Sequence, residues 1–189
     1  LRAFPDCWEI ALDNDCILWE APASLRTWLE EGDPAQCLIA ADVVPAHGVF
    51  APWAGPQPAN AGIRGTPPGY DLGGHMRRLL EEYGAALRSE LDEQGLQVAA
   101  VSRLSAPAVV ELDEVTITSP FPPHLPDLGS CGAHFVGLNE KLLPWELEGR
   151  PATDWIREHW VRHRLELYRR VEVPLPEHQG RPWEAPDVV

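Results

Sequence analysis

Two aspartates, one residue apart, are the first feature of the chain that could carry chemistry. Asp13 closes residues 8–13, which alternate enough between apolar and polar types to form a strand, and Asp15 lies just beyond it. Carboxylate oxygens are hard ligands that suit Mn²⁺ or Mg²⁺, and such a cation can bridge phosphate oxygens. An ordinary turn around Asn14 is the alternative interpretation. The strand end favours the metal site, because α/β folds bind ligands there.

A second group of candidates lies near the only lysine of the chain. His134 stands in an apolar segment, residues 133–138, where an imidazole could complete a carboxylate metal site. A hydrogen-bonded structural histidine is the alternative for such a position. Lys141 follows Gly137 by four residues and could contact a phosphate, although a single lysine must lie somewhere in any case.

Two further polar segments could face a substrate. Asn60 could orient a polar ligand, and Gly62 would allow a ligand to approach the backbone closely; a simple Asn-containing turn is the alternative. Asp92, Glu93 and Gln94 stand where a helix is expected to begin and could present a carboxylate or an amide to a substrate. Acidic residues at a helix start also favour the helix dipole without any further function.

Composition restricts the classes of protein and partner. The 189 residues fit one domain with an ordinary apolar content, and a net charge of −14 makes a nucleic-acid partner unfavourable. The longest uncharged run, residues 43–63, contains four prolines, so we expect no membrane span. Without zinc spacing or a Cys-x-x-Cys pair, the four cysteines are interpreted as reduced thiols. We therefore expect a cytoplasmic protein.

Alternating strands and helices must position these candidates, and this alternation favours an α/β fold. Strands are expected over residues 8–13, 37–44, 108–118 and 133–138. Helices are expected over residues 22–31, 72–88, 92–102 and 153–171. The segments 45–60 and 119–129 are rich in proline and are expected to be loops.

The order of the motifs resembles the landmarks of nucleotide-sugar glycosyltransferases of the GT-A fold. Asp-x-Asp comes first, then Asn-Ala-Gly at residues 60–62, then Asp-Glu-Gln-Gly-Leu at residues 92–96, and last His-Phe-Val-Gly with a later Lys and Pro-Trp. The pattern is most similar to glycosyltransferase family 8, the glycogenin and galactosyltransferase type. The resemblance spans about residues 8–145 and implies a GT-A-like mixed sheet flanked by helices.

This resemblance implies a metal-dependent sugar transfer from a nucleotide-sugar donor to an acceptor that the sequence does not identify. Asp13, Asp15 and His134 would hold Mn²⁺, or Mg²⁺, on the donor diphosphate. The implied donor and acceptor contacts are Asn60, Gly62, Gly137 and Lys141. The implied catalytic residues are Glu93 with Gln94, or Asp92 if the register is shifted by one.

The family binds its nucleotide with elements that precede the Asp-x-Asp, whereas only twelve residues precede Asp13 here. We therefore interpret residues 1–171 as the C-terminal part of a GT-A-like domain, N-terminally truncated and inactive or weak alone, followed by a proline-rich tail at residues 172–189. Two other hypotheses are a carboxylate-metal hydrolase of phosphate esters and a non-catalytic interaction domain.

Overall fold

The computed structural model describes residues 2–84, 86–136 and 146–174, and it shows a mixed α/β fold. The strands of the larger sheet are, in spatial order, β1 (Glu9–Leu12), β4 (Ala59–Thr66), β3 (Leu38–Ala41) and β5 (Ala108–Val110). A second sheet has the order β2 (Cys16–Leu18), β7 (Gly132–Phe135) and β6 (Val115–Thr118). Each sheet contains both parallel and antiparallel pairs. A small pair, β8 (Glu146–Leu147) and β9 (Arg150–Pro151), precedes the last helix.

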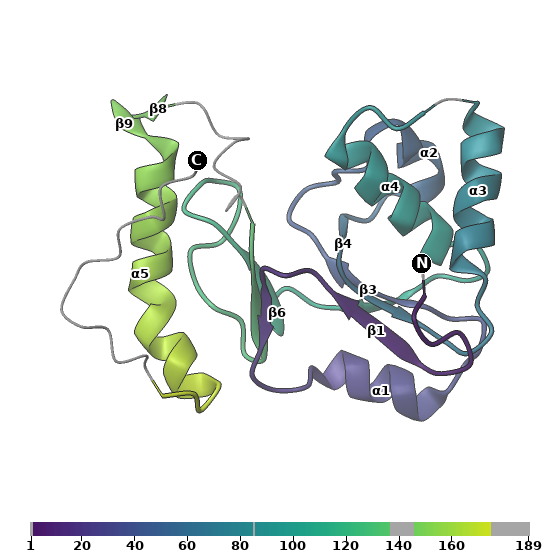
Figure 1. The fold of residues 1–189 in the computed structure, drawn as a ribbon, viewed down its shortest axis with the longest axis horizontal. Coiled ribbons are helices and arrows are strands. Elements are labelled where there is room, and N and C mark those ends of the chain that lie inside the picture. The colour runs from purple at the N-terminus through teal and green to yellow at the C-terminus, as the bar shows by residue number, and fades with distance from the viewer. Residues whose placement is uncertain (1, 85, 137–145, 175–189) are drawn as a thin grey trace.

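The helices cover both faces of the larger sheet and one face of the smaller one (Figure 1). They are α1 (Ala23–Glu31), the short η1 (Gly48–Phe50) and α2 (Ala51–Ala54), α3 (Leu72–Tyr83), α4 (Glu90–Val101) and α5 (Ala152–Arg170). Helix α1 lies on one face of the larger sheet and α3 and α4 lie on the other, while α5 packs on the second sheet. Within the described residues, no helix is long and apolar enough to cross a membrane.

Local sequence signals explain where the helices begin and end. Asp71 caps α3 by accepting a hydrogen bond from the Gly74 backbone N at 2.8 Å. Gly84 ends that helix in the left-handed conformation, with φ of 71°, so the helix stops before the expected residue 88. Ser89 and Asp92 form a capping box at the start of α4.

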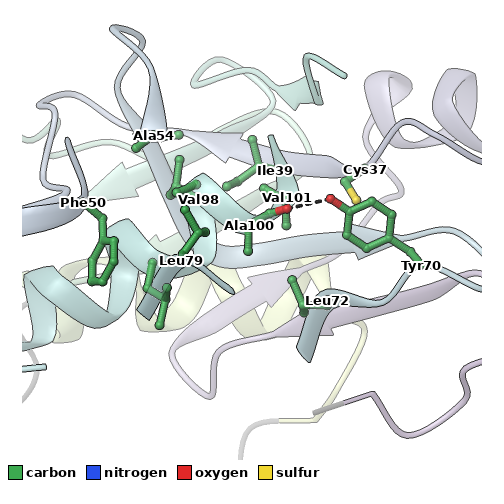
Figure 2. Close-up of a cluster of buried hydrophobic side chains, with 13 residues drawn as sticks. Cys37, Ile39, Phe50, Ala54, Tyr70, Leu72, Leu79, Val98, Ala100 and Val101 are labelled. Carbon is green, nitrogen blue, oxygen red and sulfur yellow. Dashed lines mark hydrogen bonds between the residues drawn. The ribbon is translucent and has the colours of Figure 1, made fainter. Parts of the chain in front are cut away.

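The main core lies between the larger sheet and the helices α3 and α4. Figure 2 shows its members, which come from β3, β4, the short helices, α3, α4 and the loop residues Cys37 and Tyr70. Tyr70 is buried there and donates its hydroxyl hydrogen bond to the Ala100 carbonyl at 2.6 Å, which satisfies its polar end. A second cluster on the opposite face packs Trp28 of α1 against Leu38 and Ile63. The larger sheet is therefore buried on both faces.

The chain passes directly from one sheet to the other between β1 and β2. Strand β1 ends at Leu12 and β2 begins at Cys16, so the Asp13–Asp15 turn forms the crossing. The expected strand over residues 8–13 is thus confirmed for β1, and the two aspartates lie at the junction of the sheets. Because β1 pairs with β4 and β2 pairs with β7, this turn lies between β4 and β7.

Candidate metal and ligand site at the sheet junction

Hydrogen bonds fix the Asp13–Asp15 turn between the two sheets. The Asp13 backbone N donates to the Gly62 carbonyl of β4 at 2.8 Å, and the Asp15 carbonyl accepts from the Phe135 backbone N of β7 at 3.0 Å. Cys16 then pairs with His134 in the β2–β7 ladder. Since residues opposite each other in a ladder share a face, this register brings the Cys16 and His134 side chains together.

The closest polar contact at the junction joins Asp15 and His134. Asp15 Oδ1 lies 3.1 Å from His134 Nε2, and the histidine side chain is buried while the carboxylate is partly exposed. Burial alone would lower the pKa of His134, but hydrogen bonds with Asp15 and Cys16 and their charges raise it to about 10. Burial also raises the pKa of Asp15, but the hydrogen bond and charge of His134 outweigh it and lower that pKa. A proton shared by this pair competes directly with a divalent cation for the same lone pairs.

Cys16 joins this pair to form a three-residue donor cluster. The carboxylate of Asp15, the thiol of Cys16 and a ring nitrogen of His134 all lie within 4.8 Å of one another. The Cys16 thiol donates to the Gly62 carbonyl, with its sulfur 3.4 Å from the oxygen. Cys16 was not among the candidates from the sequence, although this cysteine directly follows Asp15. Asp13 is not a member of this cluster.

Gly62 is required at the junction because there is no room for a side chain. A Cβ there would overlap the His134 ring and lie 2.8 Å from the ring's Nδ1 and from Asn60 Oδ1. Residues 61–63 of β4 lie opposite no residue of β3, since Ile39 pairs with Arg64 and Ala40 pairs with Asn60. This β-bulge brings the Gly62 backbone against the imidazole. We expected a ligand to approach the backbone of Gly62 closely, and in the structure the His134 ring does so.

The Asn60 amide holds the bulge in place. Its Oδ1 accepts from the Gly62 backbone N at 2.7 Å, and its Nδ2 donates to Asp42 Oδ2 at 3.0 Å. Asp42 is buried just after β3, and its other carboxylate oxygen accepts from the Val43 backbone N at 2.6 Å. Sequence reasoning missed Asp42, because only the pairing of β3 with β4 places it beside Asn60.

Arg64 is a partly buried cation in β4, two residues beyond Gly62. It lies across the ladder from Ile39, whose side chain is in the core under α4, so Arg64 also projects to the α4 side. Burial lowers its pKa, while the negative charges of Asp13, Glu9 and Glu93 act in the other direction. Its guanidinium makes no hydrogen bond or ion pair with the described part of the chain. Arg64 therefore connects Asp13 electrostatically with the start of α4.

The three expected catalytic residues differ in their surroundings. Asp92 is buried, and its carboxylate accepts hydrogen bonds from the backbone N of Val49, Arg88 and Ser89, which lower its pKa. Gln94 donates through Nε2 to the Ala46 carbonyl at 2.9 Å. Both side chains therefore fix the start of α4. The exposed Glu93 carboxylate makes no hydrogen bond to the described residues.

The remaining expectations concern Gly137 and Lys141, which lie outside the described residues. Comparison with known proteins adds no assignment, since no protein-family model, curated protein or solved structure matches the chain.

Proposed function

We propose that the junction is the cation site of a metal-dependent glycosyltransferase, which moves a sugar from a nucleotide-diphosphate donor to an acceptor. The observation that carries the proposal is the 3.1 Å contact between Asp15 and His134. These two residues come from distant parts of the sequence, and they are the carboxylate and the imidazole that the order of the motifs assigns to one cation.

The residues at the junction fit a divalent cation. The paired Asp15 and His134 side chains supply an oxygen and a nitrogen donor, and Asp13 lies at the other end of the same turn. Bound there, Mn²⁺ or Mg²⁺ would neutralise the charge that develops on the departing diphosphate. Asn60 and Gly62 keep the imidazole in position from the β4 side.

Arg64 and Glu93 extend the proposed site along the α4 side of β4. We assign Arg64 to the donor phosphates, because a partly buried guanidinium without an ion pair to the described residues is a favourable partner for an anion. Among the three expected catalytic residues, Glu93 is the exposed one and is able to face the reacting sugar, whereas Asp92 and Gln94 position the helix. Gly137 and Lys141 remain proposed diphosphate contacts.

The metal site is tested first, by thermal unfolding with and without Mn²⁺. At about 100 times the Kd, binding would stabilise the chain by about 2.7 kcal/mol. That corresponds to a rise in melting temperature of about 5–10 °C for a chain of this length. Asp15→Asn and His134→Gln should remove the rise, and Asp6→Asn, at an exposed position, should retain it.

The reaction is tested with a panel of sugar nucleotides, measuring Mn²⁺-dependent release of nucleoside diphosphate. Turnover of at least one donor is expected, and it should be lost in Asp15→Asn. Release of phosphate from simple phosphate esters without donor turnover would assign the site to a hydrolase instead. A melting temperature that ignores Mn²⁺ would contradict both enzymes.

A further inference from the structure

The proposed transfer leaves one donor atom of the junction unused, the sulfur of Cys16. All four cysteines are free, and Cys16 is the one that lies beside the Asp15–His134 pair. Its thiol is partly buried, donates to the Gly62 carbonyl at 3.4 Å and lies across the β2–β7 ladder from His134. A thiol in this position is available as a metal ligand.

The geometry of the cluster suits a small tetrahedral cation. Zn²⁺ binds sulfur at about 2.3 Å and nitrogen or oxygen at about 2.0–2.2 Å, which places neighbouring donor atoms roughly 3.5 Å apart. The three donors here lie within 4.8 Å of one another, and the Asp15–His134 contact is 3.1 Å. Small side-chain rotations would therefore bring all three onto one ion.

The two ring nitrogens of His134 have different surroundings. His134 is only 5% exposed, and its buried Nδ1 has no hydrogen-bond partner among the described residues. This nitrogen faces Gly62, whose carbonyl also accepts the Cys16 thiol. The Asp15 contact is made by the other ring nitrogen, Nε2, which is therefore the nitrogen that would bind an ion together with Asp15.

The chemistry of the donors decides which cation is preferred. A thiolate is a soft ligand that selects Zn²⁺ over the harder Mn²⁺ and Mg²⁺, and the general order of affinities already places Zn²⁺ far above Mn²⁺. The Cys16 thiol and the protonated His134 ring each release a proton to solvent when they bind the ion. Three protein ligands leave a fourth position open, as in zinc sites that bind water or a substrate.

We propose that Asp15, Cys16 and His134 form a three-ligand Zn²⁺ site at the sheet junction. Zn²⁺ then competes with Mn²⁺ for Asp15 and His134. The ligand assignment stands on the geometry alone, whereas its consequence, inhibition of transfer by Zn²⁺, rests on the proposed function. Cys16 would thus make sugar transfer sensitive to the ratio of the two cations.

The test uses Co²⁺ as a spectroscopic substitute for Zn²⁺ on the full chain. A near-ultraviolet thiolate-to-cobalt absorption band is expected in the wild type and in Cys7→Ser, in which an exposed thiol is removed. Cys16→Ser should lose the band. A wild-type chain without the band overturns the proposal, and so does a band that survives in Cys16→Ser.

Calorimetric titrations with Zn²⁺ and Mn²⁺ give the second measurement. Even changes around a metal's ligands lower affinity by about 10–100-fold, so loss of the sulfur should reduce the ratio of Zn²⁺ to Mn²⁺ affinity by at least about 10-fold. Cys7→Ser should leave this ratio unchanged, and an unchanged ratio in Cys16→Ser would refute the sulfur ligand. Neither the titrations nor the Co²⁺ spectra contain a sugar nucleotide. Failure to turn over any sugar nucleotide would therefore remove the proposed function without affecting the Co²⁺ result.

Discussion

A single methyl group at Gly62 would disturb the candidate cation site. The buried His134 ring cannot move away from a Cβ there without losing its 3.1 Å contact with Asp15. We expect Gly62→Ala to destabilise the fold by about 1–3 kcal/mol, as other overpacked cores do. It should also abolish the rise in melting temperature caused by Mn²⁺.

Urea unfolding with and without Mn²⁺ measures both effects of the Gly62 substitution. Gly73→Ala is a matched control, because its Cβ would meet no atom closer than 3.6 Å and it lies within helix α3. That control should gain about 0.5–1 kcal/mol from reduced backbone freedom in the unfolded chain. An Mn²⁺ response that Gly62→Ala retains would contradict the close packing of the site.

Arg64 provides a prediction about the donor rather than the cation. Arg64→Met keeps much of the aliphatic length and removes the charge, so donor affinity should fall by about 10-fold, equivalent to about 1.4 kcal/mol. Mn²⁺ affinity in the absence of a donor should not decrease, because a neighbouring positive charge has been removed. Arg77→Met, on the exposed face of α3, is the control. Equal donor affinity in the two variants, measured by calorimetry, would exclude Arg64 from the phosphate contact.

At the scale of elements, the start of α4 separates a structural carboxylate from a reactive one. Asp92→Ala removes three hydrogen bonds to backbone N atoms and should cost about 2 kcal/mol in the free energy of unfolding. Glu93→Gln, one residue later, should change that free energy by less than about 0.5 kcal/mol and still reduce donor turnover.

Chemical denaturation and a turnover assay of both variants test whether Asp92 is structural and Glu93 is reactive. Glu90→Gln, in the same helical turn and exposed, should alter neither quantity. Full turnover in Glu93→Gln would place the reacting carboxylate elsewhere.

The anchoring of α5 on the second sheet predicts a pH dependence. His159 is buried, with Nε2 2.9 Å from Thr118 Oγ1 of β6. Burial, together with the charges of His163 and Arg162, lowers its pKa to about 4. Between pH 6.5 and 4 the unfolded chain binds a proton that the folded chain does not, so stability is present above pH 6.5 and decreases as the pH falls.

The expected loss at His159 is roughly 3 kcal/mol over this interval, since one unit of pKa corresponds to about 1.4 kcal/mol. His159→Gln keeps a hydrogen-bonding group and should flatten the profile of unfolding free energy between pH 6.5 and 4. An equally steep profile in this variant would assign the acid sensitivity to another group.

The sequence predicted the long elements and missed the features that depend on strand pairing. Asp71 and the apolar periodicity of α3 correctly located that helix, whereas the left-handed Gly84 ended it earlier than the periodicity suggested. Strand β2 has three residues, which is too short for a periodic signal. The proline-rich loop expected over residues 45–60 contains η1, α2 and the first residues of β4.

The candidate site also combines residues that the sequence predicted with residues that it did not. The resemblance placed Asp15 and His134 on one cation. Cys16 comes beside His134 only through the register of β2 with β7, and Asp42 and Arg64 come near the candidate residues only through the registers of β4 with β1 and β3. A register is set by contacts between distant segments, which a single sequence does not display.

For the whole molecule, a net charge of −14 must be reconciled with an anionic donor. The described junction itself contains Asp13, Asp15, Asp42 and nearby Glu93, so without a cation the local field as well as the distant one repels phosphates. A divalent cation and Arg64 would offset three of these four negative charges and would attract phosphates only at short range. The donor must therefore approach against a repulsion that salt can screen.

This repulsion predicts that the nucleotide-sugar donor associates faster as the ionic strength rises. Raising the salt from 0.01 to 0.15 M shortens the Debye length from about 30 to about 8 Å. With Mn²⁺ saturating, the association rate of a nucleotide-sugar measured by stopped flow should rise, because the long-range repulsion is screened and the short-range contacts persist. The corresponding free sugar, which is uncharged, is the control and should show no dependence. A rate that falls steeply with salt would mean that a basic surface, rather than a bound cation, attracts the donor.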